Sequence, residues 1–540
     1  MSNKKQQSRP GGMGGPMSSM GSVEKAKDFK GTMKKLLQHL KPYRIPMIFV
    51  VIFAIGSAAF TIVGPKILGN ATTEIFEGLV NKVSGTGSGI DFTNISKTLT
   101  MLVVLYVISA AFSFIQTFVT SDISQKVSYN LRKEISEKIN RLPLKYFDKN
   151  THGEVLSRVT NDVDAIGQNL NQILSQMITS VTTIIGVLIM MLSISIRMTL
   201  VSLIVIPLSL IFIMGVVKKS QKYFKSQQEY LGHTNGHVEE MYSGHNIMKA
   251  FNGEEKAIAK FDELNETLYN SAWKSQFLSG MMMPMMTFIG NLGYVLVAIM
   301  GGYLTIKKAI QVGDILSFIQ YTRSFMQPIA QTAQIANVMQ ATAAAAERVF
   351  EFLEEQEQSA DTKKSVSTEN IRGEVEFKNV HFGYDEDKII INDFSVNIKP
   401  GQKVAIVGPT GAGKTTIVKL LMRFYELNSG NILIDGHDSK DFTRDDLRNM
   451  FGMVLQDTWL FNGSMMENIR YGKLDASDEQ VIEAAKLAHA HHFIKTLSEG
   501  YNMEINEEAN NISQGQKQLL TIARAILADP KILILNLHFL

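Results

Sequence analysis

The sequence contains no cysteine and comparatively little charge. Without cysteine, the 540-residue chain has no disulfide, no thiolate nucleophile and no cysteine-ligated metal. Only 19% of its residues are Asp, Glu, Lys or Arg, below the roughly 25% of ordinary soluble domains. The formal net charge is +3, which excludes a strongly basic nucleic-acid binder. The apolar share of 45% is ordinary, so the distribution of apolar residues carries the information.

The N-terminal segment lacks the apolar core of a signal peptide. It is rich in Gly, Met and Ser, and we predict a disordered cytoplasmic tail over residues 1–28. Residues 29–41 have the pattern of a short, basic, amphipathic helix, which is typical of a segment on a membrane surface.

Six long stretches that follow have no charge or histidine, apart from one arginine. They cover residues 45–65, 98–121, 166–196, 198–217, 275–306 and 315–346, and Arg323 interrupts the last one. A membrane-spanning helix needs about 20 apolar residues, and six such stretches in a row are far more typical of a membrane domain than of buried core helices. The sixth is the least apolar, because it contains several glutamines. We therefore predict a six-helix transmembrane domain over residues 29–346.

The loops between these stretches differ in basic residues. The 122–165 and 218–274 loops are rich in Lys and Arg, and the alternate loops are poorer. The positive-inside rule places the two rich loops, and therefore both termini, in the cytoplasm. Both rich loops have a helical pattern and are long enough to extend well beyond the bilayer. The sequence thus predicts a multi-pass protein of the cytoplasmic membrane.

The character of the sequence changes after a charged linker at residues 347–370. Residues 375–377 and 394–398 alternate like strands, residues 403–407 form a short apolar strand, and residues 416–424 form an apolar helix. This order predicts an α/β domain over residues 371–540.

A phosphate-binding loop lies between that apolar strand and helix. Residues 408–415 match G-x-x-x-x-G-K-[ST], the P-loop pattern. Glycines let the backbone curl so that N–H groups point inward, and the helix N-terminus adds positive charge. We expect Lys414 to reach the β and γ phosphates and the Thr415 hydroxyl to ligate Mg²⁺. The predicted phosphate-binding residues are Gly408, Pro409, Thr410, Gly411, Ala412, Gly413, Lys414, Thr415 and Thr416.

Three further features refine the nucleotide site. Tyr384 precedes the P-loop and is predicted to stack on a purine ring, with an ordinary strand aromatic as the alternative. Gln456 ends an apolar run and is predicted to touch Mg²⁺ or the attacking water, with a surface glutamine as the alternative. Ser513 and Gly515 open a helix, which makes a second anion-binding helix start. Two chains facing head to tail would bring this helix onto the partner's ATP.

In the order and spacing of these features, the chain resembles half-transporters of the ATP-binding cassette (ABC) exporter family, of the multidrug or lipid type. The resemblance extends from about residue 29 to residue 535. It implies coupling loops near residues 140–165 and 232–256 that dock on nucleotide domains, and a homo- or heterodimer of such chains. It also implies that the signature motif, which departs from the usual residues at Ile512 and Gln514, consists of Ser513, Gln514, Gly515 and Gln516.

The resemblance implies a function as well as a fold. The expected fold class is an α-helical six-span membrane domain followed by an α/β P-loop NTPase domain. The expected function is ATP-driven export of a hydrophobic or amphipathic substrate, a drug-like molecule or a lipid, across the cytoplasmic membrane of a bacterium. Alternating access in the dimer would use ATP and Mg²⁺, and the parent protein is expected to hydrolyse ATP.

The end of the sequence departs from the family. The strand at residues 531–535 should lead to a Mg²⁺-binding aspartate and a catalytic glutamate, but Asn536 and Leu537 follow it. Leucine is no general base, and asparagine brings no carboxylate charge to magnesium. We interpret the chain as truncated at this strand, with a destabilised nucleotide domain. The alternative function is an ATP-binding, hydrolysis-deficient regulatory or structural subunit, or a non-functional fragment.

Three other features have competing interpretations. The methionine-rich run from Met281 to Met286 either lines a promiscuous apolar cavity or packs against lipid and neighbouring helices. Arg323 is costly inside a membrane, and it either contacts substrate, faces a water-filled cavity or reaches the interface. His489 and His492 are spaced for metal ligation, but a polar helix face is the better interpretation. No metal is expected beyond the Mg²⁺ that accompanies ATP.

Overall fold

The computed structural model divides the chain into two compact units, which are described separately. The first unit contains Met1–Glu137 and Gly153–Glu354, and the second contains Lys138–His152 and Glu355–Leu540. The structure describes residues 26–85, 89–362, 365–385, 388–409, 411–455, 458–506 and 511–535, without the side chains of residues 329, 330 and 332–334. The predicted tail lies almost wholly outside these residues. Residues 138–152 cluster with the C-terminal unit, although the chain places them between two predicted spans.

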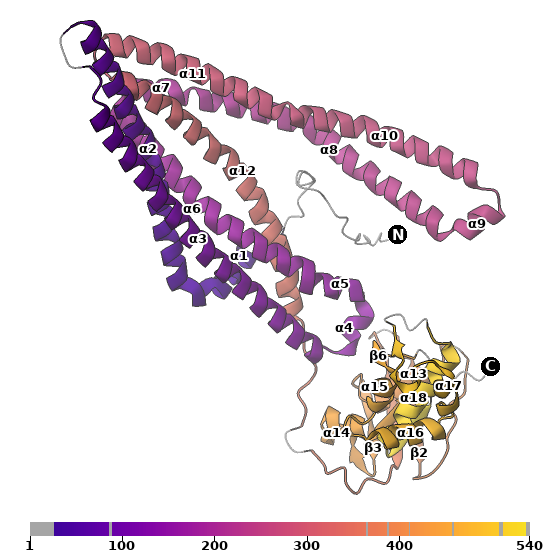
Figure 1. The fold of residues 1–540 in the computed structure, drawn as a ribbon. Helices are drawn as coiled ribbons and strands as arrows, with labels where there is room; N and C mark the ends of the chain where they lie inside the picture. The colour runs from indigo at the N-terminus through magenta and orange to yellow at the C-terminus, as the bar shows by residue number, and fades with distance from the viewer. Residues whose placement is uncertain are drawn as a thin grey trace. The chain divides into compact units, whose positions relative to one another are not determined.

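Helices make up the described elements of the first unit (Figure 1). A short amphipathic helix comes first, as predicted, and it buries Leu36 and Leu40. The helices are α1 (Phe29–Leu40), α2 (Arg44–Val83), α3 (Phe92–Arg141), α5 (His152–Ser157), α6 (Val163–Ile194), α7 (Ile196–Leu203), α8 (Val205–Ser243), α9 (His245–Ala250), α10 (Glu254–Gly280), α11 (Met282–Ile306) and α12 (Val312–Glu354).

Five helical runs of the described residues are long and apolar enough to cross a membrane. They are Phe29–Val83, Phe92–Arg141, His152–Ile194, Ile196–Ser243 and Glu254–Ile306, and each covers all or nearly all of one of the first five predicted spans. Helix α12, which contains the predicted sixth span, is not among them. By length and composition α12 does not meet this criterion, so the predicted sixth span stays a prediction. The physical reason is the amide side chains of α12, such as Gln320, Gln327 and Gln331, which reduce its apolar character.

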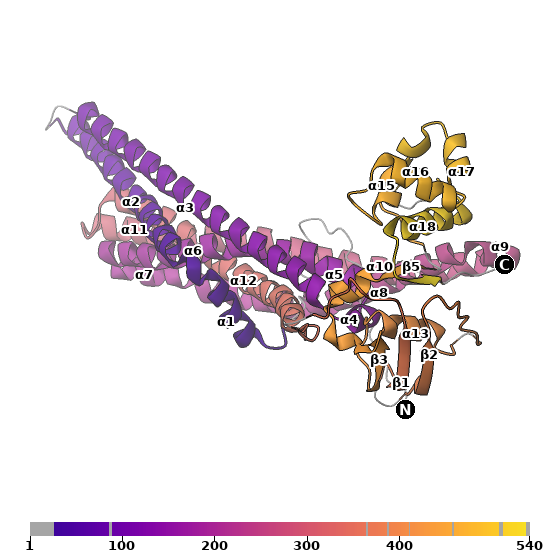
Figure 2. The ribbon, with the colours of Figure 1, turned by 90° about the horizontal axis from the view of Figure 1, so that it is seen from below.

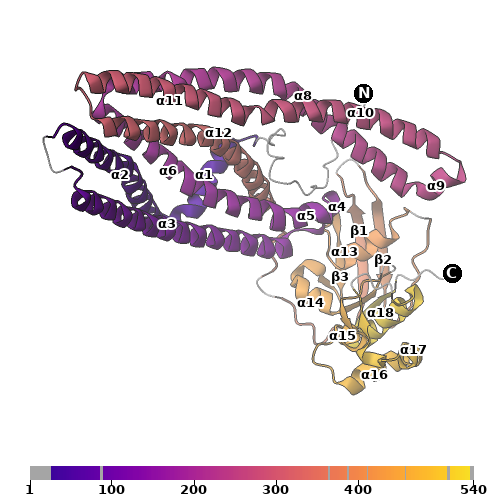
Figure 3. The same cartoon turned by 45° about the horizontal axis from the view of Figure 1, so that its top comes forward.

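Helices α2, α6 and α12 pack together and form the centre of the first unit (Figure 3). The α2–α12 contact is close because two glycines face each other there: a Cβ on Gly313 would lie 1.7 Å from the carbonyl oxygen of Gly69. Lys66 Nζ donates to Asp314 Oδ1 at 2.6 Å across the same contact. Small residues permit such close helix approach.

Helices α8 and α10 lie side by side as a long hairpin with α9 at its tip (Figure 1). Ser226 Oγ and Ser271 Oγ are 2.9 Å apart across the hairpin, and Ser275 Oγ donates to Gln227 Oε1 at 2.5 Å. This arrangement confirms the predicted helical character of residues 218–274.

The second unit is a mixed α/β structure (Figure 2). Its main sheet has the strand order β2-β1-β3-β4, with antiparallel pairs, and β5 pairs with β8 in parallel. Strands β1 and β2 confirm the two predicted alternating segments. The elements are α4 (Leu144–Lys149), β1 (Val375–Phe382), β2 (Ile391–Ile398), α13 (Lys414–Leu421), β3 (Ser429–Ile434), β4 (His437–Asp438), α14 (Arg444–Asn449), β5 (Phe451–Val454), β6 (Gly463–Ser464), α15 (Met465–Arg470), α16 (Asp478–Leu487), α17 (His491–Thr496), β7 (Glu504–Ile505), α18 (Gln514–Ala528) and β8 (Ile532–Leu535).

Separate apolar clusters stabilise the two parts of this unit that carry the predicted site. One face of β1 packs against α13, and the cluster includes Phe377, Val380, Ile417 and Leu420. Helices α15, α16, α17 and α18 gather in a second lobe (Figure 2), whose cluster includes Met465, Ile469, Val481, Ala485 and Leu520. Helix α13, which follows the P-loop, therefore packs in the first cluster, and the signature helix α18 belongs to the second.

The predicted strand at residues 403–407 is wrong for this structure, in which these residues have no regular structure. Val404, Ile406 and Val407 are 53%, 46% and 87% exposed. A strand needs neighbours for its backbone N–H and C=O groups, and none of the described strands pairs with this segment. The predicted linker starts at residue 347, but helix α12 continues to Glu354. The first part of the linker is therefore helical.

Candidate nucleotide site

The P-loop backbone has left-handed conformations at two glycines. Gly411 has φ of 88° and Gly413 has φ of 86°, values that glycine adopts without the steric cost of a Cβ atom. Ala412 N donates to Pro409 O at 3.1 Å and closes a tight turn between them. Gly413 then serves as the N-cap of α13, which has no side-chain cap. The first N–H groups of α13 therefore remain available to an anion.

Lys414 follows this turn directly and folds back over it. Its Nζ donates to Gly408 O at 2.7 Å and to Pro409 O at 3.0 Å. Thr415 is exposed at the start of α13, whereas Thr416 is buried. A cation, two left-handed glycines and an uncapped helix N-terminus make a binding site for phosphate oxygens. Thr410 lies outside the described residues.

Tyr384 lies beside the phosphate-binding helix. Its hydroxyl is 3.2 Å from Thr416 Oγ1, and Lys419 Nζ is 5.8 Å from its ring centroid. The edges of Phe382 and Tyr425 pack against it, each with 5.0 Å between ring centroids. The ring thus belongs to an aromatic cluster on α13, and its stacking on a purine stays a prediction.

The signature residues form the start of α18. Ser513 Oγ accepts from Gln516 N at 3.3 Å, and Gln516 Oε1 accepts from Ser513 N at 2.8 Å, which makes a reciprocal capping box. Gln514 Nε2 donates to Thr458 Oγ1 at 3.4 Å. Ser513, Gln514 and Gly515 are exposed, so this helix start is accessible to solvent. Its contact with a partner's ATP stays a prediction.

Arg524 fixes α18 in place, and sequence reasoning missed it. Its Nε donates to Asn468 O at 2.8 Å and its Nη2 to Asn468 Oδ1 at 3.2 Å, which links α18 to α15. Burial lowers the pKa of this guanidinium from its usual value. The available signal was a single arginine within the apolar C-terminal part of α18, eight residues before the apolar strand β8.

Several predicted positions lie outside the described residues. They are Gln456, Asn536 and Leu537, and the last two directly follow β8, whose final residue is Leu535. Their roles therefore stay predictions. Within the described part of the chain, no group of three or more His, Cys, Asp or Glu side chains is placed to hold a metal ion. His491 Nδ1 lies instead 2.8 Å from the Tyr501 hydroxyl.

Helix α4, in the first predicted coupling loop, contacts the nucleotide-binding part of its own unit. The Tyr425 hydroxyl donates to Asp148, and Gln358 Nε2 donates to Leu142 O at 2.8 Å. Tyr425 also belongs to the aromatic cluster with Tyr384, so α4 is linked to the P-loop helix through two tyrosines.

We expect Tyr425→Phe to loosen α4 without disturbing the aromatic cluster, because only the hydroxyl is removed. The lost hydrogen bond to an exposed carboxylate should cost about 1 kcal/mol. Amide hydrogen exchange over residues 144–149 should become faster. Tyr471→Phe, at an exposed tyrosine, is the control. Unchanged exchange in residues 144–149 of Tyr425→Phe would show that this hydrogen bond does not hold α4.

Comparisons with known proteins cover both units. Residues 47–329 match the ABC transporter transmembrane region, and residues 391–536 match the ABC transporter family. A fatty acid ABC transporter ATP-binding/permease protein of Mycobacterium bovis is 41% identical, with 95% of this chain and 86% of the relative aligned. An ABC transporter ATP-binding protein of Bacillus subtilis is 40% identical over 95% of this chain and 83% of its own length.

A third relative is named for a specific cargo. An ATP-dependent lipid A-core flippase of Syntrophus aciditrophicus is 33% identical over 81% of this chain and 72% of its own length. The matches to these relatives run from the membrane domain through the P-loop into the cassette. With the phosphate-binding geometry at Lys414 and five apolar spans, they establish that this chain belongs to the ABC transporter family, as an ATP-driven exporter half-transporter that crosses the membrane several times.

Proposed function

We propose that two such chains form a dimer that binds ATP with Mg²⁺ at residues 408–416 and exports an amphipathic molecule. The observation that carries this proposal is the P-loop: Lys414 at the loop carbonyls, the left-handed glycines and the uncapped start of α13. In the proposed arrangement residues 29–346 form the membrane domain with α12 as its sixth span, residues 347–370 the linker and residues 371–540 the nucleotide-binding domain. Both termini then lie in the cytoplasm.

The chain's own residues define what the site does. The N–H groups at the start of α13 and the Lys414 ammonium neutralise the charge of the phosphates, because both present donors toward the same turn. The Thr415 hydroxyl is the ligand that this helix offers to Mg²⁺, which when bound would share charge with the phosphate oxygens. Tyr384 and Gln456 are proposed as the purine-stacking and water-linked residues.

A second copy completes the proposed site through Ser513 and Gly515, which are exposed at the start of α18. The α8–α10 hairpin offers it a further contact. At the tip of that hairpin Ile247 and Phe251 are 68% and 82% exposed, and no residue of α9 is buried within its unit. Large exposed apolar side chains of this kind are typical of interaction surfaces. We propose that α9 docks on the nucleotide-binding domain of the second copy.

The names of the relatives support the proposed cargo. Fatty acids and lipid A are amphipathic, with long hydrocarbon chains attached to a polar head. We propose a cargo of the same general form for this chain. The fold itself does not choose among such molecules, because unrelated substrates are carried on one architecture.

Uptake of a lipophilic dye into inverted membrane vesicles tests this function. Vesicles that contain the intact chain, alone or with a partner half-transporter, should accumulate the dye when ATP is added. Vesicles supplied with a non-hydrolysable ATP analogue are the control and should not. Absence of ATP-dependent uptake in every combination would contradict export.

A hydrolysis-deficient regulatory subunit is the second candidate, and Asn536 and Leu537 favour it because neither supplies a carboxylate. Under this alternative, labelled ATP binds to the purified chain and is retained without turnover. Phosphate release by the purified chain, above that of Lys414→Ala, would reject it.

A further inference from the structure

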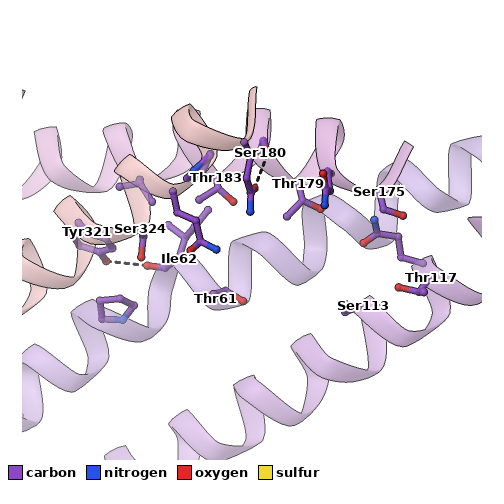
Figure 4. Close-up of a pocket in the computed structure, with 17 residues that line it drawn as sticks. Thr61, Ile62, Ser113, Thr117, Ser175, Thr179, Ser180, Thr183, Tyr321 and Ser324 are labelled. Carbon is purple, nitrogen blue, oxygen red and sulfur yellow. Dashed lines mark hydrogen bonds between the residues drawn. The ribbon is translucent and has the colours of Figure 1, made fainter. Parts of the chain in front are cut away.

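A polar cavity lies within the first unit, between α2, α3, α6 and α12 (Figure 4). Its volume is about 380 Å³, roughly the share of a dozen water molecules in the liquid. Thirteen of its 17 lining residues carry a hydroxyl or amide side chain, and the other four are Ile62, Pro65, Val187 and Pro328. None of the described residues that line it is charged. It is therefore a neutral, hydrogen-bonding cavity inside apolar helices.

Helical spacing brings these polar side chains together. On α6, Ser175, Thr179 and Thr183 recur at every fourth residue, and Figure 4 shows all three at the cavity. On α3, Ser113 and Thr117 have the same spacing. Residues four apart lie on one face of a helix, so each helix turns a polar stripe toward the others. In a membrane helix such a stripe is unfavourable toward lipid and must face protein or ligand.

The hydrogen bonds of the cavity are only partly satisfied. The Tyr321 hydroxyl donates to Ile62 O at 2.9 Å, and Ser180 Oγ donates to Gln331 Oε1 at 3.4 Å (Figure 4). Ser175 Oγ is shielded from solvent and has no hydrogen-bond partner among the described residues. A buried hydroxyl without a partner costs about 1–3 kcal/mol, which a ligand with its own donors and acceptors would recover.

The cationic side chains near the cavity, Lys66 and Arg323, do not supply it with a positive charge. Lys66, next to Pro65 in the sequence, is paired with Asp314 at 2.6 Å. Arg323 is exposed on α12 and is not a lining residue. A carboxylate in the cavity would therefore lose its water without gaining a counter-charge, which is strongly unfavourable.

We propose that the cavity receives the uncharged, hydroxyl-bearing head group of the exported amphiphile and discriminates against a carboxylate head. This proposal rests on the proposed export function and names the substrate class of the same membrane domain. Under this proposal the cargo of this chain has a different head group from that of its Mycobacterium bovis relative, which is named for fatty acids. The hydroxyl and amide groups of the lining supply both donors and acceptors, which a polyol head requires.

Two ligands with the same hydrocarbon chain test the proposal: radiolabelled 1-monooleoylglycerol and oleate. Binding is measured without ATP to the purified full chain in nanodiscs of zwitterionic phospholipid, at alkaline pH, where oleate is ionised. Empty nanodiscs give the partition of each ligand into lipid alone. We expect the protein to bind the glyceride at least about tenfold more tightly than oleate after this correction.

Two substitutions connect the preference to the cavity. Gln116 is only 5% exposed and lines the cavity, so Gln116→Leu should weaken glyceride binding by about fivefold, the value of one uncharged hydrogen bond. Thr179→Arg adds a cation to the wall and should increase the affinity for oleate. Thr100→Val, on the exposed face of α3 outside the cavity, is the control and should change neither ligand. Gel filtration confirms that each variant remains monodisperse.

Three results would each overturn the proposal: oleate binding as tightly as the glyceride, Gln116→Leu retaining full glyceride affinity, or Thr179→Arg binding oleate no better. Because ATP is absent from these measurements, they are independent of the vesicle assay. If only the head-group preference fails, ATP-dependent uptake persists. If export fails, ligand binding persists without uptake.

Discussion

Replacing Lys414 by alanine should strongly weaken the binding of ATP by this chain. Its ammonium lies 2.7 Å from Gly408 O and 3.0 Å from Pro409 O, so it is held at the mouth of the turn. Phosphate oxygens would replace these carbonyls as acceptors with charge-assisted hydrogen bonds. Their loss should cost about 2–3 kcal/mol, or roughly 30- to 150-fold in Kd for ATP, measured by equilibrium binding of a fluorescent analogue.

The control for this experiment is Lys486→Ala, because Lys486 is an exposed lysine of α16 that pairs with Glu483 at 2.6 Å. Its affinity for the analogue should equal that of the unsubstituted chain. Gly413→Ala tests the backbone part of the site. At φ of 86° an added Cβ is strained, and it would lie 2.9 Å from Ile391 Cδ1. Undiminished analogue binding by Lys414→Ala would remove Lys414 from the site.

Replacing Gly313 by alanine should have the largest effect on stability. The added Cβ would lie 1.7 Å from Gly69 O and 2.5 Å from Gly69 C, both backbone atoms of α2. No rotamer change relieves a clash with backbone, so α2 and α12 must separate. The hydrogen bond from Gly313 N to Thr73 Oγ1 at 3.0 Å and the Lys66–Asp314 pair should weaken with it. We expect a loss of about 3 kcal/mol or more.

The measurement is the melting temperature of the detergent-solubilised chain, with the yield of monodisperse protein as a second readout. Gly302→Ala in α11 is the matched control, since a Cβ there meets no atom within 4 Å. That change should be neutral or stabilising, because alanine is favoured over glycine in a helix by about 1 kcal/mol. Equal melting temperatures for Gly313→Ala and the unsubstituted chain would show that the two helices are not held at this crossing.

Local features of this protein were predictable from the sequence. The P-loop turn depends on glycines that directly precede α13, and the signature helix is capped by Ser513 and Gln516, three residues apart. Such interactions are made within one turn of the chain, so a short pattern contains them completely. The same holds for the apolar spans, since length and hydropathy are properties of a single segment.

Features that need distant partners were not predictable in this way. The segment at residues 403–407 has the composition of a strand but lacks a neighbour in the described sheets. The close approach of Gly69 and Gly313 joins positions separated by more than 200 residues. Arg524 contacts Asn468, 56 residues away in the sequence, so no local pattern contains this interaction.

The sequence by itself determined the family, the nucleotide that the chain binds and the division into a membrane part and a cassette. These features depend on motifs and hydropathy, which are properties of contiguous segments. Tertiary structure alone decided that residues 138–152 pack with the cassette and that hydroxyl and amide side chains of four helices line one uncharged cavity. Each polar residue in those helices is unremarkable in isolation. The polar stripes surround one cavity only because the helices pack together. The contacts that hold the helices join side chains far apart in the sequence.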